Sequence, residues 1–177
     1  MQQFFHPAVS SYFARTYGTP TPVQLRAWQV LHGETSRQHA LISAPTGEGK
    51  TLAAFLAIID RLVRQAAAGE DIGHARILYI SPLKALANDI EKNLQQPLAG
   101  IRAELAQMGI EIPEIQAMVR TGDSSQSERA RLVRRRPQIV VTTPESFYLL
   151  LTSESGRRLL STIETVIIDE IHALVAE

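Results

Sequence analysis

LISAPTGEGKT, residues 41–51, joins a short apolar run to a long stretch with helical periodicity. The run from His39 to Ile42 predicts a buried strand, and apolar side chains recur at helical spacing from Leu52 to Val63. Between them, Gly47 and Gly49 allow backbone torsions that turn successive N–H groups toward one anion. A strand, a glycine-containing loop and a helix in this order predict a phosphate-binding loop.

The two residues that open the helix have different expected roles. Lys50 can reach the β- and γ-phosphates of a nucleotide, while the Thr51 hydroxyl can hold Mg²⁺. Ala44 stands at the first glycine position of the usual pattern, but two glycines remain, so the cradle is still feasible. The alternative is a plain β–α turn with a surface lysine, which the flanking strand and helix disfavour. The expected phosphate-binding residues are Ala44, Pro45, Thr46, Gly47, Glu48, Gly49, Lys50 and Thr51.

Composition restricts the class of protein. With 177 residues, of which 45% are apolar, the chain can bury one sizeable core, and we expect residues 1–177 to form a single domain. Lysine plus arginine (18) equals aspartate plus glutamate (18), so any contact with nucleic acid must be local. The absence of cysteine excludes disulfides and cysteine-based metal sites. The apolar runs are too short for a membrane span and the N-terminus lacks a signal-peptide pattern, so we expect a cytoplasmic location and no membrane partner.

Two short helices are expected ahead of the phosphate loop, at residues 4–17 and 22–31 of an N-terminal segment that comprises residues 1–35. Thr21 suits the N-cap of the second helix, and Gln24, three residues later, completes a capping box. The Gln24 amide both donates and accepts, so it could instead read the N6 and N7 edge of adenine. The residues alone give the two interpretations equal weight.

Four further apolar runs alternate with helical patterns along the rest of the chain. Together with the first run they predict an α/β fold, a mostly parallel sheet with helices on both faces. The helix that starts near Leu83 is expected to be interrupted at Pro97, with a further helix ending near Gly109. The four additional strands are expected at residues 76–80, 115–119, 138–142 and 164–170, with helices at 125–135 and up to Leu151.

Three of the expected strands end in a serine or threonine closely followed by proline at a helix start. The three junctions are Ser43-Ala44-Pro45, Ser81-Pro82 and Thr143-Pro144. They lie at the carboxyl ends of strands, where open α/β sheets bind ligands, and helix-start N–H groups are partners for phosphate oxygens. For the second and third junctions, ordinary helix capping is the favoured interpretation.

The last apolar run ends abruptly in two adjacent carboxylates, Asp169 and Glu170. Acids at a buried strand end are costly unless a cation or hydrogen-bond donors meet them. Mg²⁺ shared with Thr51 would supply the cation, which gives Asp169 a metal-holding role and leaves Glu170 to orient or deprotonate a water. A solvated acidic strand end is the less favoured alternative. His172 is a weaker candidate, and the other histidines show no metal-ligand spacing.

These motifs together resemble the first RecA-like domain of superfamily 2 helicases, in the DExH group. The phosphate loop and Asp169-Glu170-Ile171-His172 carry the resemblance, and residues 81–89 and 143–146 match the superfamily's motifs Ia and Ic. The amino-acid sequences of these motifs, together with residues 17–24 and 121–124, are most similar to those of the large helicase-related (Lhr) family. The match covers nearly the whole chain, from about Phe5 to Glu177.

The resemblance implies a RecA-like P-loop domain of an ATP-dependent helicase, with ATP and Mg²⁺ as cofactors and a single nucleic-acid strand, DNA favoured over RNA, as partner. It implies that Gln24 contacts adenine and that His172 couples nucleotide state to the strand-binding face. Lys50 and Glu170 would be catalytic, and Thr51 and Asp169 would hold Mg²⁺. The implied track for the strand's phosphates comprises Pro82, Leu83, Lys84, Thr121, Gly122, Thr143, Pro144 and Glu145. A basic run, Arg129, Arg131, Arg134, Arg135 and Arg136, could add affinity, although a solvated helix face is the favoured interpretation.

A motor of this kind also needs a second RecA-like domain, whose arginine contributes about 10³ to 10⁵ in turnover. The chain ends seven residues after Glu170, so we expect it to be part of a longer motor. Alone, it is expected to bind nucleotide weakly, to hydrolyse it slowly if at all, and not to unwind a duplex. Two rival functions remain open. One is an ATP-driven translocase or remodeller without strand separation, and the other is a non-catalytic nucleotide-binding module.

Overall fold

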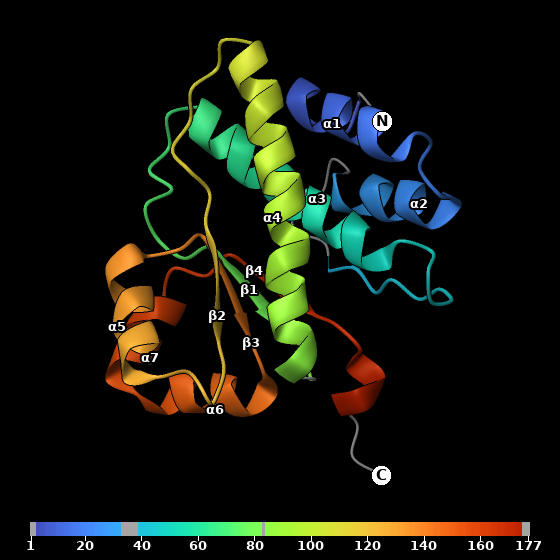
Figure 1. Cartoon of the computed structure of the whole chain (residues 1–177). Coiled ribbons are helices and arrows are strands. Elements are labelled where there is room, and N and C mark those ends of the chain that lie inside the picture. The colour runs from blue at the N-terminus through green and yellow to red at the C-terminus, as the bar shows by residue number, and fades with distance from the viewer. Residues whose placement is uncertain (1–2, 33–38, 83, 175–177) are drawn as a thin grey trace. The chain divides into compact units, whose positions relative to one another are not determined.

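The computed structural model describes residues 3–32, 39–82 and 84–174 (Figure 1). The chain divides into two compact units. The first comprises Met1–Gly69 and Pro97–Ile112, and the second comprises Glu70–Gln96 and Pro113–Glu177. One long helix, α4 (Lys84–Gln107), contributes its first half to the second unit and its second half to the first.

The first unit is built on α1 (Pro7–Tyr17), α2 (Pro22–Leu31) and α3 (Lys50–Ala67). Its core contains Trp28, whose ring meets Phe5 and Phe13 edge-on, with centroids 4.8 and 5.5 Å away. The Trp28 indole also donates a hydrogen bond to the Ala53 carbonyl at 3.1 Å, which joins α2 to α3. The two expected N-terminal helices are therefore present and packed into one core.

A buried carboxylate fixes the start of α1 in this unit. Asp60 of α3 is completely buried and accepts hydrogen bonds from the His6 backbone N–H (2.5 Å) and from Arg64 Nε (2.7 Å). Removing the Asp60 carboxylate would leave the Arg64 guanidinium without its counter-charge and the His6 N–H without its acceptor, which would destabilise the fold. The segment that precedes α1 is thereby held against α3.

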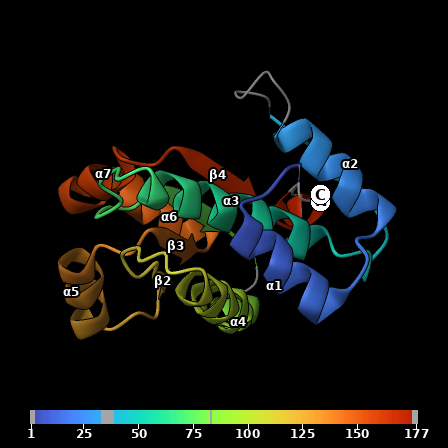
Figure 2. The same cartoon turned by 90° about the horizontal axis from the view of Figure 1, so that it is seen from above.

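The second unit contains a parallel sheet in the order β2-β3-β1-β4. In the register, Ile77 of β1 pairs with Ile139 and Thr165, and every pair along the strands stays in step. Helices α5, α6 and α7 lie on one side of the sheet, and the first half of α4 lies on the other (Figures 1 and 2). The strands are β1 (Ile77–Ile80), β2 (Ala117–Arg120), β3 (Ile139–Thr142) and β4 (Thr165–Ile168), and the helices are α5 (Gln126–Arg135), α6 (Pro144–Thr152) and α7 (Glu154–Leu160).

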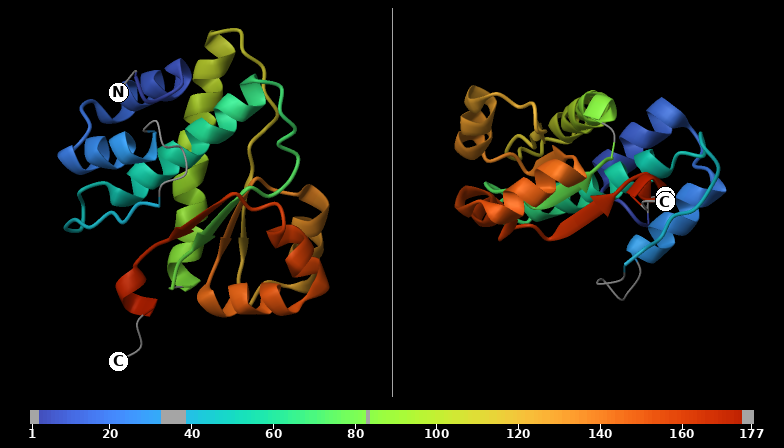
Figure 3. Two further views of the ribbon diagram at one scale, coloured as in Figure 1. Left: turned by 180° about the vertical axis from the view of Figure 1, so that it is seen from behind. Right: turned by 90° about the horizontal axis from the view of Figure 1, so that it is seen from below.

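The expected strand at His39–Ile42 is wrong. Residues 39–45 form no strand in the structure, and Leu41 is 82% exposed. A run of four residues gains little unless a neighbouring strand pairs with it, and among the described residues none does. The described sheet accordingly has four strands rather than five. β4 lies at one edge of the sheet (Figure 3), and its side chains Val166 and Ile168 are 51% and 48% exposed.

The expected interruption at Pro97 is also wrong, because α4 runs through this residue without a break. Proline removes one backbone hydrogen bond from a helix interior, a cost that burial on both sides can offset. Leu94 and Ile101, one turn either side of Pro97, are both almost fully buried. Tertiary packing thus overrides the local preference. Among the described helices, α4 included, none has the length and apolar character needed to cross a membrane.

The junction of α6 and α7 generates a test of this packing. A Cβ atom at Gly156 would lie 2.1 Å from the Leu150 carbonyl oxygen, a backbone atom that has little room to move. We expect Gly156→Ala to destabilise the protein by about 2–3 kcal/mol, although alanine is the better helix former by about 1 kcal/mol. Urea unfolding measures the change. The neighbouring exposed position supplies the control, since Ser155→Ala should stay within about 0.5 kcal/mol. Equal stabilities for the two variants would contradict the close approach.

Candidate nucleotide-binding site

The loop before α3 folds around the lysine that ends it. Lys50 Nζ donates hydrogen bonds to the carbonyl oxygens of Ala44 (2.6 Å) and Pro45 (2.8 Å). Gly47 and Gly49 adopt φ angles of 89° and 78°, in the left-handed region that glycine tolerates. The predicted loop therefore closes on the predicted lysine, and α3 begins directly after it.

The start of α3 differs from the other described helix starts. Its N-cap is Gly49, which supplies no side-chain acceptor for the first backbone N–H groups. The side chains of His6, Thr21, Ser125, Thr143 and Ser153 accept such a hydrogen bond at α1, α2, α5, α6 and α7. Uncapped N–H groups and the positive end of the helix dipole favour an anion at this position.

Gln24 lies against the same loop. Its side chain is 4% exposed, with Oε1 accepting from the Thr21 N–H (2.9 Å) and Nε2 donating to the Gly49 carbonyl (3.4 Å). Thr21 Oγ1 accepts from the Gln24 N–H and donates to the Glu48 carbonyl at 3.0 Å. The capping-box interpretation of Gln24 is thus confirmed. A Cβ atom at Gly49 would lie 2.4 Å from Gln24 Nε2, so this glycine is needed for space as well as for its torsion.

In the second unit, the four strands end in one row. Backbone hydrogen bonds continue past the paired residues, from Ser81 N–H to the Thr142 carbonyl (3.0 Å) and from Asp169 N–H to the Ile80 carbonyl (2.9 Å). Because the strands are parallel and in register, the residues that follow them lie together at the carboxyl-terminal end of the sheet. In sheet order these residues are Thr121, Thr143, Ser81 and Asp169.

The acidic pair has a defined geometry. Asp169 Oδ1 accepts the Glu170 N–H at 3.0 Å, and Asp169 Oδ2 accepts the Tyr79 hydroxyl. Glu170 adopts a φ angle of 48°, which is uncommon for a residue other than glycine and is concentrated at functional sites. Glu170 Oε2 lies 3.4 Å from His172 Nδ1, in the short 3₁₀ helix η1 (Ile171–Leu174) that follows the strand.

The expected strand-binding residues are placed unequally. Thr143 is completely buried and caps α6, with its hydroxyl accepting from the Ser146 N–H at 3.4 Å, so ordinary capping is confirmed at this junction. Pro144 is partly buried and Glu145 is exposed on the first turn of α6. Thr121, Gly122 and Pro82 are each exposed or partly exposed at strand ends. Leu83 lies outside the described residues, as does the side chain of Lys84, the first residue of α4.

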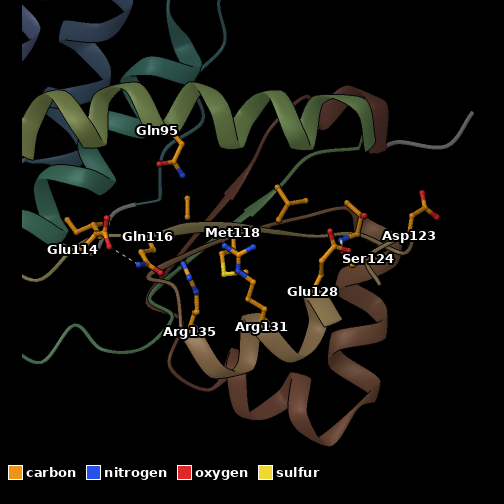
Figure 4. A pocket seen from close by; sticks show the side chains of 13 residues that line it. Gln95, Glu114, Gln116, Met118, Asp123, Ser124, Glu128, Arg131 and Arg135 are labelled. Atoms are coloured by element: carbon orange, nitrogen blue, oxygen red, sulfur yellow. Dashed lines mark hydrogen bonds between the residues drawn. The ribbon is translucent and has the colours of Figure 1, made fainter. Parts of the chain in front are cut away.

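A pocket of about 500 Å³ lies beside β2, next to this row of strand ends (Figure 4). Thr121 lines it, and Arg131 and Arg135 of the basic run point into it from α5 (Figure 4). Glu128 also lines it, and hydrogen bonds from the backbone and hydroxyl of Ser125 hold the pKa of Glu128 below its ordinary value. The pocket therefore presents both signs of charge. Arg134 and Arg136 are exposed, and the side chain of Arg129 lies outside the described part of the chain.

Sequence reasoning missed one residue of the site, Tyr79. Its hydroxyl contacts the Asp169 carboxylate, but in the sequence it stands in the apolar run Ile77–Ile80 and looks like an ordinary core aromatic. The signal in the sequence was the tyrosine hydroxyl at the third position of β1, the strand that pairs with the acidic strand β4. The pairing of β1 with β4 was needed to use it.

Comparison with curated proteins finds relatives over nearly the whole chain. It is 48% identical over 176 residues to "Lhr helicase/uracil glycosylase" of Escherichia coli (strain K12), covering 96% of this chain and 11% of that protein. It is 45% identical over 174 residues to "ATP-dependent helicase Lhr-Core" of Methanothermobacter thermautotrophicus, covering 98% and 20%. The chain thus spans about a tenth to a fifth of the length of these relatives.

Solved structures share the fold, and one also shares much of the sequence. The structure of Mycobacterium smegmatis helicase Lhr bound to ssDNA and AMP-PNP matches with a TM-score of 0.86 and 42% identity, covering 97% of this chain and 21% of that one. The yeast DEAD-box splicing factor Prp28 matches in fold alone, with a TM-score of 0.79 and 20% identity over 98% of this chain and 38% of that one. A family model described as DEAD/DEAH box helicase matches residues 21–177. This chain therefore belongs to the DEAD/DEAH box helicase family.

Proposed function

We propose that this chain binds ATP and Mg²⁺ and couples ATP hydrolysis to movement along a single strand of nucleic acid. The observation that carries the proposal is the loop of residues 44–50, which closes around Lys50 and leads into a helix whose N-cap has no side chain. An ammonium group and uncapped N–H groups at one helix start suit the phosphates of a nucleotide. The relative of 42% identity was solved with the ATP analogue AMP-PNP.

The Thr51 hydroxyl and the Asp169 carboxylate would each offer an oxygen ligand to Mg²⁺. Hydroxyl and carboxylate oxygens are ligands that this ion accepts, and Asp169 keeps one lone-pair direction on each oxygen beyond its two hydrogen bonds. When bound, Mg²⁺ supplies charge that stabilises the phosphoryl group during transfer. Glu170 follows Asp169 directly and would orient the attacking water and accept its proton. Lys50 would stabilise the charge on the β- and γ-phosphates.

The row of strand ends would contact the nucleic-acid strand. Thr121, Gly122, Pro82, Leu83 and Lys84 would approach the phosphates at β2 and β1, and Thr143, Pro144 and Glu145 would do so at β3. Because the Thr143 hydroxyl is used in capping α6, its contribution would be to hold the local backbone rather than to touch a phosphate itself. We favour DNA as the polymer, since the relative of 42% identity was solved with ssDNA.

A second RecA-like domain would complete the motor. We propose that it contributes an arginine to the bound triphosphate and that His172, which lies 3.4 Å from Glu170, communicates the state of the nucleotide to the strand-binding face. The curated relatives are five to ten times longer than the matched segment, which leaves room for such a domain. A strand-displacement assay on the longer protein separates a helicase from a translocase that does not unwind.

Nucleotide binding can be measured on this chain. Saturating Mg-ATP, at about 100 times its Kd, should stabilise the protein by about 2.7 kcal/mol and raise the melting temperature by about 5–10 °C. Lys50→Met should abolish most of this rise, because the phosphates lose their cationic partner. The control is Arg134→Met, at an exposed position of α5. A wild-type melting temperature unaffected by Mg-ATP would refute nucleotide binding.

The two roles considered for Gln24 make different predictions. If Gln24 reads adenine, Gln24→Ala should lower the affinity for ATP by about 1–3 kcal/mol and leave that for GTP nearly unchanged. If Gln24 only links α2 to the phosphate loop, both nucleotides should lose affinity equally. Isothermal titration with ATP and GTP decides between these results. We expect selective loss of ATP binding, with Thr21→Ala as the control that breaks the capping box without removing the amide.

Hydrolysis depends on Glu170 in this proposal. In a protein that includes the second RecA-like domain, Glu170→Gln should slow single-turnover ATP hydrolysis at least about 10²-fold, because the amide cannot accept a proton from water. Binding of ATP should be retained, which titration of the same variant checks. Equal hydrolysis rates for wild type and variant would instead favour a non-catalytic nucleotide-binding module.

A further inference from the structure

Tyr79 is the one residue of β1 whose side chain carries a polar atom. The side chain is completely buried, and its hydroxyl donates a hydrogen bond to Asp169 Oδ2. The register explains this contact, since Tyr79 pairs with Ile167, two residues before Asp169 on the same face of the sheet. A phenol that is buried without a hydrogen-bond partner costs free energy, and the contact with Asp169 avoids this cost for Tyr79.

The Asp169 carboxylate is consequently held at both oxygens. The Tyr79 hydroxyl meets Oδ2 and the Glu170 backbone N–H meets Oδ1 at 3.0 Å. Two donors on different oxygens fix the plane of a carboxylate, whereas a single donor leaves it able to rotate about its bond to Cβ. Each oxygen retains a second lone-pair direction, which is then fixed in space as well.

We propose that Tyr79 is the positioning residue for the metal-holding carboxylate of Asp169. This inference rests on the proposed function, because it gives that carboxylate a Mg²⁺ ion to face. Donors that orient a metal-binding carboxylate commonly account for 10- to 100-fold in metal affinity or activity, since without them the ligand must be ordered when the ion binds. With Tyr79 in place, the Asp169 carboxylate is already ordered in the folded sheet before the ion binds.

The test is the magnesium dependence of nucleotide binding by Tyr79→Phe, which keeps the buried ring and removes the hydroxyl. A fluorescent ATP analogue is titrated in excess EDTA and again at a series of Mg²⁺ concentrations. We expect the Mg²⁺ concentration for half-maximal enhancement to rise about 10-fold or more. The affinity in EDTA should remain within about twofold of wild type, since the phosphate loop is unchanged.

Two further variants separate positioning from a general packing effect. Tyr12→Phe removes another buried tyrosine hydroxyl, in the first unit, and should leave the Mg²⁺ dependence unchanged. In an Asp169→Asn background, Tyr79→Phe should have little further effect on Mg²⁺, because the carboxylate is already gone. An unchanged Mg²⁺ dependence, or equal losses in EDTA and in Mg²⁺, would overturn the inference while leaving nucleotide binding intact. A wild-type chain that bound no analogue would overturn the proposed function and this inference with it.

Discussion

The in-step parallel register of the four strands is the constraint on which the second unit depends. Ile80 of β1 pairs with Thr142 on one side and Ile168 on the other, so the strands end together. The polar residues that follow the strands therefore lie together at the carboxyl-terminal end of the sheet. A shift of one residue in β4 would send Asp169 to the opposite face of the sheet, away from the Tyr79 hydroxyl. The position of Asp169 is thus determined by the backbone pairing of the apolar strands β1 and β4.

In the first unit, the loop of residues 44–50 is held closed by hydrogen bonds rather than by strand pairing. Two backbone carbonyls of the loop accept from Lys50, and two more, those of Glu48 and Gly49, accept from Thr21 and Gln24. The helix α2 is itself joined to α3 through Trp28. The start of α2 therefore supports the loop before α3, because Thr21 and Gln24 bond the loop as well as forming the capping box of their helix.

Sequence patterns predicted the elements whose signals are local. The caps at Thr21 and Thr143, the glycine loop and the acidic strand end were all visible as short motifs, and the alternation of strands and helices gave the parallel sheet. The errors arose where distant contacts decide the outcome. The short run at 39–42 does not show that Leu41 is exposed, and Pro97 does not show that burial of its neighbours keeps α4 continuous. Tyr79 was invisible for the same reason, since its role depends on which strand lies beside β1.

Among the helix starts whose N-cap the structure describes, α3 differs from the others in its N-cap side chain. Where the N-cap is serine, threonine or histidine, its side chain already accepts one of the helix's first N–H groups. At α6 this use is nearly complete, because Pro144 has no N–H, Ser146 N–H bonds Thr143 Oγ1 and Phe147 N–H bonds the Thr143 carbonyl. At α3 the cap is a glycine with a left-handed torsion, and a Cβ atom there would lie 2.4 Å from Gln24 Nε2, so no N-cap side chain meets the first N–H groups of the helix. The N-cap side chain therefore separates the two helix starts: at α6 the threonine hydroxyl caps the helix, and at α3 the glycine leaves the first N–H groups without a side-chain acceptor.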